Sequence, residues 1–417
     1  MKFVTNISVE EYENFVLNNS KSHFMQSHYF GEIMRYKNFS PYLVGLKEND
    51  KLVATALLLK KKLIGNYCYF YCPRGYILDY SNYKLIHIFT DHIKKFAKKE
   101  KALFVKIDPD IKLHDLDSDG NILGNSNEKL VDYLKMLGYK HKGFNTEFVN
   151  EQPRFTFRLN IDKEMDEIYK NIHPTTRKIL NKGNQYQLNL YKGSSNDIDK
   201  FYETMKDTAE REHLHLTPIE YYRNFYEILN QQNMSDLYVV EVDIHDLIIT
   251  YEKNLEYLEL ELQNLDDPKY KNKDKQENLK KDLLNKIEKV KKEIDFIHTI
   301  KKEHIILSSI ITVKYGDKVW TIHGGNSNIL RELNSNYLLY YEIIKDAHEE
   351  GYKIVDFFGT SGIANPDKSN PIFGIHSFKK RFGGEYTEFI GEFDLIIHKF
   401  LYFTYKKLLP FYRKIKK

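Results

Sequence analysis

The feature that most constrains the fold of this 417-residue chain is a pattern that occurs twice. The first copy, residues 52–110, reads "LVATALLLKKKLIGNYCYFYCPRGYILD", then "YKLIHIFTDHIKKFAKKEK" and "ALFVKIDPD". The second copy, residues 304–362, reads "HIILSSIITVKYGDKVWTIHGGN", then "NYLLYYEIIKDAHEEG" and "YKIVDFFGTSG". Each predicts strand, turn, strand, amphipathic helix and strand, and the last strand ends on an aspartate, Asp108 or Asp356. In the second copy, the apolar face of the predicted helix consists of Leu338, Tyr341, Ile344 and Ala347. The duplication therefore predicts an α/β (α+β) protein of two related subdomains with mixed sheets.

The length and composition of the chain allow two such subdomains. Hydrophobic residues make up 41% of the chain, which is typical of a globular protein with a sizeable core. We expect residues 1–150 to form the first subdomain, completed by part of the segment 378–417, and residues 151–250 and 304–400 to form the second. The formal charge of +4 is too small for a generic nucleic-acid binder, so any basic surface must be local.

An insertion with a different pattern interrupts the second copy at residues 251–303. Its apolar residues step by four and three positions, which is the seam of a coiled coil, in two series separated by "DDPKYKNKDK". The first series is Tyr251, Leu255, Leu258, Leu262 and Leu265, and the second is Leu283, Ile287, Val290, Ile294 and Ile297. We expect an antiparallel pair of helices that forms an arm. The second helix is rich in lysine, which fits either a solvated face or contact with a polyanion or a protein partner.

The two ends of the chain bear on its location. The N-terminal residues lack the pattern of a signal peptide, and no run of 18 apolar residues occurs, so we expect a cytoplasmic protein. The basic, aromatic tail at residues 401–417 suits the surface of an anionic membrane. A helix packed on its own subdomain explains the apolar half of the tail equally well.

The stretch "GIHSFKKRFGGEYTEFIGEFD", residues 374–394, predicts a basic turn around Lys379 and then a strand over 387–393. No motif for a covalent nucleophile, a phosphate-binding loop or a zinc site occurs in the chain. The remaining polar candidates at strand ends are Asp108, His323 and Asp356. Together with Lys379 they fit direct acyl transfer to an amine, which needs a base near the amine and a cation near the oxyanion.

Both copies resemble the acetyltransferase-type fold, in which a glycine-rich loop before the central helix binds a pyrophosphate. In the second copy this loop reads "RELNSNY", with Asn334 and Asn336 where glycines are expected. Asparagine tolerates the left-handed conformation, so the turn can persist. Without these glycines the loop nevertheless disfavours CoA binding, and so disfavours one possible function, that of a CoA-dependent N-acyltransferase.

Six segments in order resemble the Fem family of peptidoglycan bridge-forming aminoacyltransferases over almost the whole chain. They are "QSHYFGEIMRYKN", "CPRGYILDY", "VKIDPD", "HLTPIEYY", "WTIHGG" and the stretch at residues 374–394. The inserted arm is similar to the helical arm of the FemA and FemB branch. The resemblance implies transfer of an amino acid from aminoacyl-tRNA to a stem-peptide or bridge amine of a precursor such as lipid II. It implies no cofactor and no metal, and a place at the inner face of the membrane. A non-catalytic scaffold that acts through the arm is the second alternative.

The resemblance also implies roles for individual residues. The catalytic residues that it implies are Asp108, Phe378 and Lys379. The substrate-binding candidates are Arg35, Lys37, Arg74, His215, Tyr221, His323 and Arg381. The chain departs from the family at Thr217, where some members have an arginine for the precursor diphosphate, and at His323, where they have a tyrosine. Diphosphate binding would then fall to Arg35, Lys37 or His215.

The arm carries candidate residues for binding tRNA. Lys286, Lys289 and Lys292 could contact the tRNA backbone. The arm could instead mediate a homodimer or association with a sister Fem transferase, and the sequence leaves these partners open.

Overall fold

The computed structural model describes residues 1–63, 65–147, 151–265 and 273–415. Within these ranges the chain forms two seven-stranded sheets and one small two-stranded sheet. The first sheet has the order β1 (Lys2–Val4), β2 (Ser40–Glu48), β3 (Lys51–Lys62), β4 (Cys68–Cys72), β5 (Ala102–Ile107), β16 (Phe393–Ile396) and β8 (Tyr139–His141). The second has the order β10 (Asn189–Gly193), β11 (Ser235–Asp243), β12 (His304–Tyr315), β13 (Lys318–Asn326), β14 (Ile354–Asp356), β9 (Phe155–Asn160) and β15 (Glu385–Glu388). The small sheet pairs β6 (His114–Leu116) with β7 (Ile122–Ser126).

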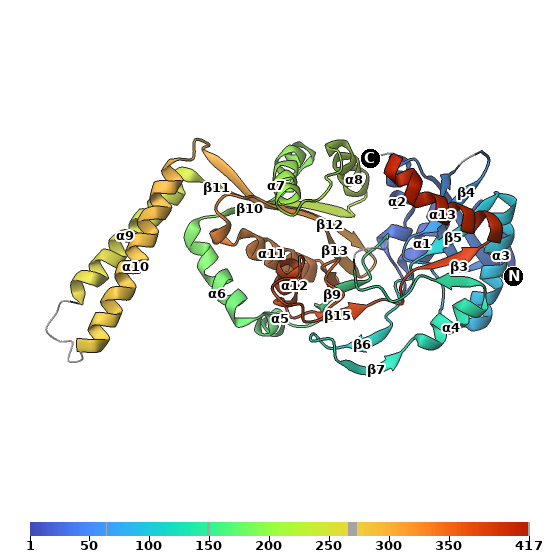
Figure 1. Ribbon diagram of the computed structural model, residues 1–417, viewed down its shortest axis with the longest axis horizontal. Helices are drawn as coiled ribbons and strands as arrows, with labels where there is room; N and C mark the ends of the chain where they lie inside the picture. The colour runs from blue at the N-terminus through green and yellow to red at the C-terminus, as the bar shows by residue number, and fades with distance from the viewer. Residues whose placement is uncertain (64, 148–150, 266–272, 416–417) are drawn as a thin grey trace.

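The helices flank the sheets and form the arm (Figure 1). They are α1 (Val9–Leu17), α2 (His28–Arg35), α3 (Tyr83–Lys99), α4 (Glu128–Met136), α5 (Met165–Asn171), α6 (Pro174–Gly183), α7 (Ile198–Arg211), α8 (Ile219–Asn230), α9 (Ile244–Asn264), α10 (Lys273–His298), α11 (Ser335–Glu349), α12 (Phe373–Lys380) and α13 (Lys399–Ile415).

The duplication predicted from the sequence is visible in the strand pairing. Each large sheet is antiparallel except for one parallel pair, β4 with β5 and β13 with β14. A helix connects each parallel pair, α3 in the first sheet and α11 in the second. Helix α3 packs on its sheet because Leu85, Phe89 and Ile93 recur on one face and are buried. The predicted fold class, two mixed acetyltransferase-like subdomains with an inserted arm, is confirmed.

The chain passes between the two sheets twice, before β9 and before β16. Strand β9 follows the elements of the first subdomain in the chain but pairs between β14 and β15 of the second sheet. Strand β16 follows β15 but pairs between β5 and β8 of the first sheet. The predicted single strand over 387–393 is therefore wrong, because Gly391 adopts a φ of 88° where the chain crosses from one sheet to the other. These two crossings of the chain link the two sheets through the backbone.

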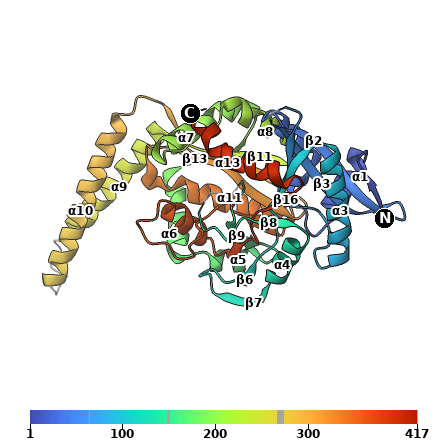
Figure 2. The ribbon, with the colours of Figure 1, turned by 45° about the vertical axis from the view of Figure 1, so that its right-hand side comes forward.

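The arm projects from the second subdomain as a pair of antiparallel helices (Figures 1 and 2). The predicted seam is confirmed, because its residues are buried or partly buried between α9 and α10. The buried ones are Tyr251, Leu258, Leu265, Leu283, Ile287, Val290 and Ile297, and Leu255, Leu262 and Ile294 are partly buried. The connection at residues 266–272, which contains most of the predicted polar break, lies outside the described residues.

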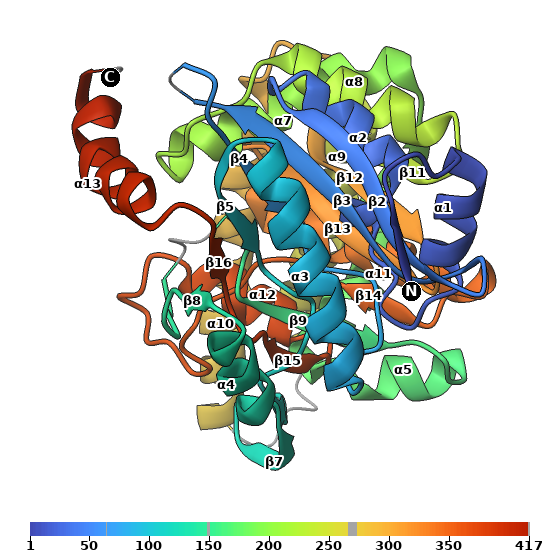
Figure 3. The ribbon, with the colours of Figure 1, turned by 90° about the vertical axis from the view of Figure 1, so that its right-hand side faces the viewer.

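The C-terminal helix α13 lies against the first sheet (Figure 3). Its Tyr402 is buried against Phe104 of β5, with ring centroids 5.4 Å apart, and its hydroxyl donates to Asp394 Oδ2 at 2.7 Å. No helix in the described part of the chain is both long and apolar enough to cross a bilayer.

Candidate functional site

Asp108 lies directly after β5 and is almost completely buried. Its carboxylate accepts two hydrogen bonds, from the Tyr71 hydroxyl at 2.8 Å and from the Arg74 backbone N–H at 2.6 Å. The second bond depends on the left-handed backbone of Arg74, φ 58°, and of Gly75, φ 80°, which turns the N–H toward the carboxylate. Burial raises the pKa of Asp108 to about 7, against the opposing effect of the Arg74 charge. A carboxylate with such a pKa can take up a proton near neutral pH.

Lys379 is buried in the last turn of α12, so the predicted basic turn is in fact helical. Its ammonium donates to the carbonyl oxygen of Phe358 and, at 2.6 Å, to that of Gly359. Burial lowers the pKa of Lys379 to about 7, although the nearby Asp356 carboxylate acts in the opposite direction. The loop that follows β14 thus accepts hydrogen bonds from an ammonium whose pKa burial has brought close to neutral pH.

The glycine pair after Lys379, Gly383 and Gly384, lies very close to neighbouring backbone. Gly383 has a φ of 81°, and a Cβ there would lie 2.7 Å from the Asn171 carbonyl oxygen. A Cβ on Gly384 would lie 3.1 Å from backbone atoms of Arg158. The two glycines thus allow the segment after α12 to pack closely against α5 and β9.

Arg74 connects the environments of Asp108 and Lys379. Its guanidinium lies 5.9 Å from the ring centroid of Phe358 and 4.7 Å from that of Phe389, and it donates to the Pro153 carbonyl oxygen at 3.1 Å. Its backbone caps Asp108, while the carbonyl of Phe358 accepts from Lys379. Arg74 and Phe358 therefore lie between the two predicted catalytic groups, Asp108 and Lys379. These groups come from different subdomains.

Phe378 points to a different neighbourhood. Its ring contacts Tyr337 and Tyr340, with both centroid distances 4.8 Å, and Phe382 at 5.3 Å. Arg381 joins the same group, since it donates to the Tyr337 hydroxyl at 3.1 Å. Phe378, which precedes Lys379 in the sequence, therefore helps to pack α12 on α11.

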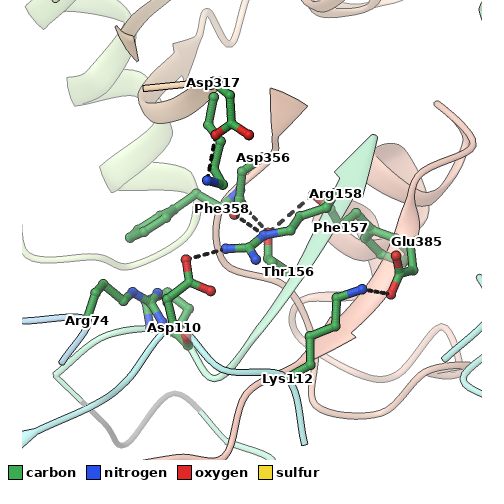
Figure 4. A network of polar contacts seen from close by, with 12 residues as sticks. Arg74, Asp110, Lys112, Thr156, Phe157, Arg158, Asp317, Asp356, Phe358 and Glu385 are labelled. Carbon is green, nitrogen blue, oxygen red and sulfur yellow. Dashed lines mark hydrogen bonds and ion pairs between the residues drawn. The ribbon is translucent and has the colours of Figure 1, made fainter. Parts of the chain in front are cut away.

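An ion network at the boundary between the subdomains holds the loop that contacts Lys379 (Figure 4). Arg158 of β9 donates to Asp356 at 2.8 Å and to Asp110 at 2.7 Å, and Thr156 donates to Asp356 at 2.6 Å. Both carboxylate oxygens of Asp356 accept hydrogen bonds, Oδ2 from Arg158 and Oδ1 from Thr156. Oδ1 also accepts from the Phe358 N–H at 2.9 Å. Arg158 draws the pKa of Asp110 well below its usual range.

Sequence reasoning missed three residues of this arrangement, namely Tyr71, Asp110 and Arg158. Asp110 stands two positions after Asp108 in "VKIDPD", and a paired acid was the available signal. Arg158 stands in "FTFRLN", where a cation inside an apolar strand indicates a buried ionic partner. Tyr71 had no such signal, because it lies in a run of buried aromatic residues.

A second group of predicted residues, Lys37, Tyr221 and His323, comes together in the structure. The Lys37 ammonium lies 4.0 Å from the ring centroid of Tyr221, and the Tyr221 ring lies 6.0 Å from that of His323. Burial lowers the pKa of Lys37, and burial together with the Lys37 charge lowers the pKa of His323 to about 3. Tyr221 and Phe358 both pack on the cluster that contains Trp320. This group provides one cation and two ring systems.

Two further candidates lie apart from both groups. Arg35 forms an ion pair with Glu32 at 2.8 Å and lines a shallow hollow of about 480 Å³ between α2 and α8. His215 is exposed on the loop before α8. Of the three residues proposed to bind a diphosphate, only Lys37 therefore lies beside Tyr221.

The predicted tRNA-contacting lysines on the arm are exposed and ion-paired within α10. Lys286 lies 2.6 Å from Asp282, Lys289 lies 3.6 Å from Glu293, and Lys292 lies 2.6 Å from Glu288. Such exposed i,i+4 pairs are weak because both groups are solvated, so a phosphate can replace the acid at little cost.

The loop before α11 keeps the turn that the sequence suggested. Asn334 adopts a left-handed conformation with a φ of 53°, and its side chain donates to the Glu332 carbonyl at 2.6 Å. No group of three His, Cys, Asp or Glu side chains that could hold a metal ion occurs among the described residues.

The architecture defines a two-subdomain α/β protein of acetyltransferase type, with an acid and a buried lysine at the junction and a helical arm. The model of the FemAB family matches residues 7–409, and the chain belongs to this family. The chain is 29% identical over 419 residues to a lipid II:glycine glycyltransferase of Staphylococcus aureus strain MRSA252, covering 98% of this chain and 96% of that protein. A protein of the same name from strain USA300 is 29% identical over 420 residues with the same coverage. The crystal structure of FemX is similar with a TM-score of 0.76 and 28% identity, over 96% of this chain and 99% of that one.

Proposed function

We propose that this protein is a transferase that moves an amino acid from aminoacyl-tRNA to an amine of a lipid-linked peptidoglycan precursor, and so builds the interpeptide bridge. The observation that carries the proposal is the match over 98% of the chain to proteins named lipid II:glycine glycyltransferase. The position of Asp108 and Lys379 on either side of Arg74 and Phe358 agrees with such a reaction.

In the proposed reaction the amine nitrogen attacks the carbonyl carbon of the aminoacyl ester. A C–N bond forms, the C–O bond to the tRNA ribose breaks, and the amine proton ends on the ribose oxygen. Asp108 would take the proton from the attacking amine, because its pKa of about 7 suits a general base at neutral pH. Lys379 in its charged form would stabilise the oxyanion of the tetrahedral intermediate. The ester is already activated, so the proposal requires no cofactor or metal.

The group of Lys37, Tyr221 and His323 is proposed to bind the diphosphate and sugar of the precursor. Lys37 is the cation of this group, and its exposed side chain holds the ammonium 4.0 Å from the Tyr221 ring centroid, where it can meet a bound anion. Because Thr217 and His323 replace an arginine and a tyrosine of other members, we expect Lys37 to carry most of the diphosphate contact.

We further propose that the protein works in the cytoplasm at the inner face of the membrane, where such a precursor is exposed. The arm is proposed to contact the tRNA backbone through Lys286, Lys289 and Lys292. A homodimer or a complex with a sister transferase is the alternative use of the arm.

A transfer assay tests the proposed function. Purified protein is incubated with lipid II and a total tRNA pool that is charged with one labelled amino acid at a time. We expect label on lipid II from one amino acid and none with Lys379→Met. Absence of label from every amino acid, on lipid II and on a precursor with an extended bridge, would contradict the proposal.

A further inference from the structure

The outer face of α13 carries large apolar side chains that are exposed. Phe400 is 81% exposed, Phe403 is 52% exposed and Leu408 is 56% exposed. With Lys407 they fall within one side of the helix, since positions i, i+3, i+7 and i+8 face the same way. The opposite side holds Tyr402, which is buried against the first sheet. The helix is therefore docked through one face and presents a second apolar face to the surroundings.

The docked face of α13 is fixed in place by polar contacts as well as by rings. Lys406 lies 3.3 Å from Asp394 and 4.7 Å from the ring centroid of Phe104. Asp394 also accepts from the Tyr402 hydroxyl. Because these contacts set the rotation of the helix, Phe400 and Phe403 are held on its outer side.

A second segment extends this surface. The turn between β3 and β4 lies beside α13, since Leu63 packs on the cluster of Phe104 and Tyr402. The rings of Tyr67 and His398 are 6.5 Å apart. Tyr67 is 41% exposed, and Lys62 is exposed next to it. In Figure 3 the adjoining ends of β3 and β4 and helix α13 lie on the same side of the first subdomain.

The charge of both segments has one sign. Residues 395–417 contain seven Lys and Arg and no acidic residue, and residues 60–67 contain three lysines and no acidic residue. Lys140 adds a further cation 5.1 Å from the Phe403 ring. Exposed rings among basic residues match the interface of an anionic bilayer, where rings enter the headgroup region and lysines meet phosphates.

The end of β3 also lies close to the Lys37 group. Lys61, at the end of β3, donates to the Lys37 carbonyl and lies 4.5 Å from the Phe39 ring centroid. The same strand end therefore borders both α13 and the residues proposed to bind the precursor diphosphate. In a lipid-linked precursor the diphosphate lies at the bilayer surface, so its binding site must be close to that surface.

We propose that the outer face of α13, together with the β3–β4 turn, is the surface by which this protein docks on an anionic phospholipid bilayer. The surface consists of Lys62, Tyr67, Phe400, Phe403, Lys407 and Leu408. This inference rests on the proposed function for the identity of the lipid-linked substrate. The contact itself requires only anionic phospholipid.

Vesicle flotation of the full chain tests the surface without substrate. Vesicles of phosphatidylcholine with 30% phosphatidylglycerol, roughly the charge of an anionic leaflet, are compared with vesicles of phosphatidylcholine alone. We expect binding to the anionic vesicles that weakens with salt. The pair Phe400→Gln with Phe403→Gln should lower the partition coefficient at least about tenfold. The pair Lys62→Glu with Lys407→Glu should lower it by about fivefold or more per residue.

A matched control uses apolar residues that are equally exposed elsewhere. Ile122→Gln with Leu123→Gln, on β7, changes side chains that are 63% and 68% exposed and should leave binding unchanged. Equal binding to both kinds of vesicle, or equal effects of the two apolar pairs, would overturn the proposal. A dimer in sedimentation that Phe400→Gln with Phe403→Gln dissolves would also overturn it, in favour of a second copy as occupant.

The outcomes separate this surface from the proposed function. Transfer to lipid II in detergent micelles should survive in the Phe400→Gln, Phe403→Gln variant. Transfer in detergent by a protein that binds no vesicle would overturn the docking surface alone. Vesicle binding through α13 by a protein without any transfer activity would leave the surface standing and overturn the function.

Discussion

Arg158 and Asp110 form an ion pair across the boundary of the two subdomains, with 2.7 Å between Nη2 and Oδ2. Arg158 belongs to a strand of the second sheet, and Asp110 follows the last strand of the first repeat. The same guanidinium binds Asp356, which anchors the loop that contacts Lys379. One buried cation thus links the position of the two subdomains to the environment of the predicted catalytic lysine.

Arg158→Met should destabilise the protein by about 3–5 kcal/mol, because two buried carboxylates lose their cation. Urea unfolding at pH 7 measures this loss. The depressed pKa of Asp110 gives the effect a pH dependence: the stabilisation is present above about pH 4 and is lost as the pH falls below it. Lys163→Met, which removes an exposed i,i+4 pair with Glu167, should change stability by less than about 0.5 kcal/mol. A similar loss for both variants would contradict the role of Arg158.

Lys379 should set the alkaline limb of the transfer rate. If its charged form stabilises the oxyanion, the rate falls as the pH rises through its pKa of about 7. Lys379→Arg keeps a charge at all these pH values and should remove this limb, at a lower maximal rate. Single-turnover transfer between pH 6 and 9 measures both. An alkaline limb that persists unchanged in Lys379→Arg would assign it to another group.

Asp108 should make stability depend on pH in a defined direction. Its pKa is about 7 in the folded protein and about 4 in the unfolded chain, so the folded state binds more protons between these values. The free energy of unfolding should therefore fall as the pH rises from 4 to 7. Asp108→Asn should lack this contribution, whereas Asp132→Asn, an exposed carboxyl on α4, should retain it. Parallel pH profiles for wild type and Asp108→Asn would contradict the raised pKa.

Lys37→Met should raise the KM for the lipid-linked precursor by about tenfold or more with little change in kcat. The physical reason is the loss of a charge-assisted contact to phosphate that is made equally in the bound and transition states. Arg35→Met is the matched control, since Arg35 pairs with Glu32 at the outer side of α2. Steady-state kinetics with varied precursor decide between them. An increase in KM for Arg35→Met alone would move the diphosphate site to the hollow between α2 and α8.

Reversal of the arm charges should weaken tRNA binding. The triple change Lys286→Glu, Lys289→Glu and Lys292→Glu should raise the KM for aminoacyl-tRNA and flatten its salt dependence, because fewer phosphates are neutralised. Lys135→Glu on α4 breaks a comparable exposed pair with Asp132 and serves as control. Unchanged tRNA kinetics in the triple variant would leave the arm to a protein partner.

The sequence predicted local structure well where one period governs a segment. The steps of four and three residues gave the arm and its seam, because each helix packs against the neighbour that follows it in the chain. The prediction for α11 was less complete. Leu338 and Tyr341 are only partly buried, whereas Tyr337, Leu339 and Ile343 join Ile344 and Ala347 in the core. The face is wider than a single stripe because this helix packs on the sheet and on α6 and α12.

Among the site residues, Asp108 was recognisable by its place at a strand end, and Lys379 by its basic surroundings. The helical state of Lys379 was not, since "GIHSFKKRFGG" has glycines at both ends and no strong helical period. The residues that the structure gathers around Lys379 come from far apart in the chain. Arg74 and Phe358 are separated by more than two-thirds of the sequence and meet only in the folded protein.

The sequence by itself therefore determined the two repeats, the arm and the polar residues at strand ends, all of which follow from contacts between near neighbours. Tertiary structure decided which strands β9 and β16 pair with, and it decided the two ion pairs of Arg158. It also decided the meeting of Asp108 with Lys379 through Arg74 and Phe358. These features depend on which surfaces of two similar subdomains bury each other. A local pattern of apolar and polar residues does not specify that choice, because the free energy comes from contacts formed only after both sheets are assembled.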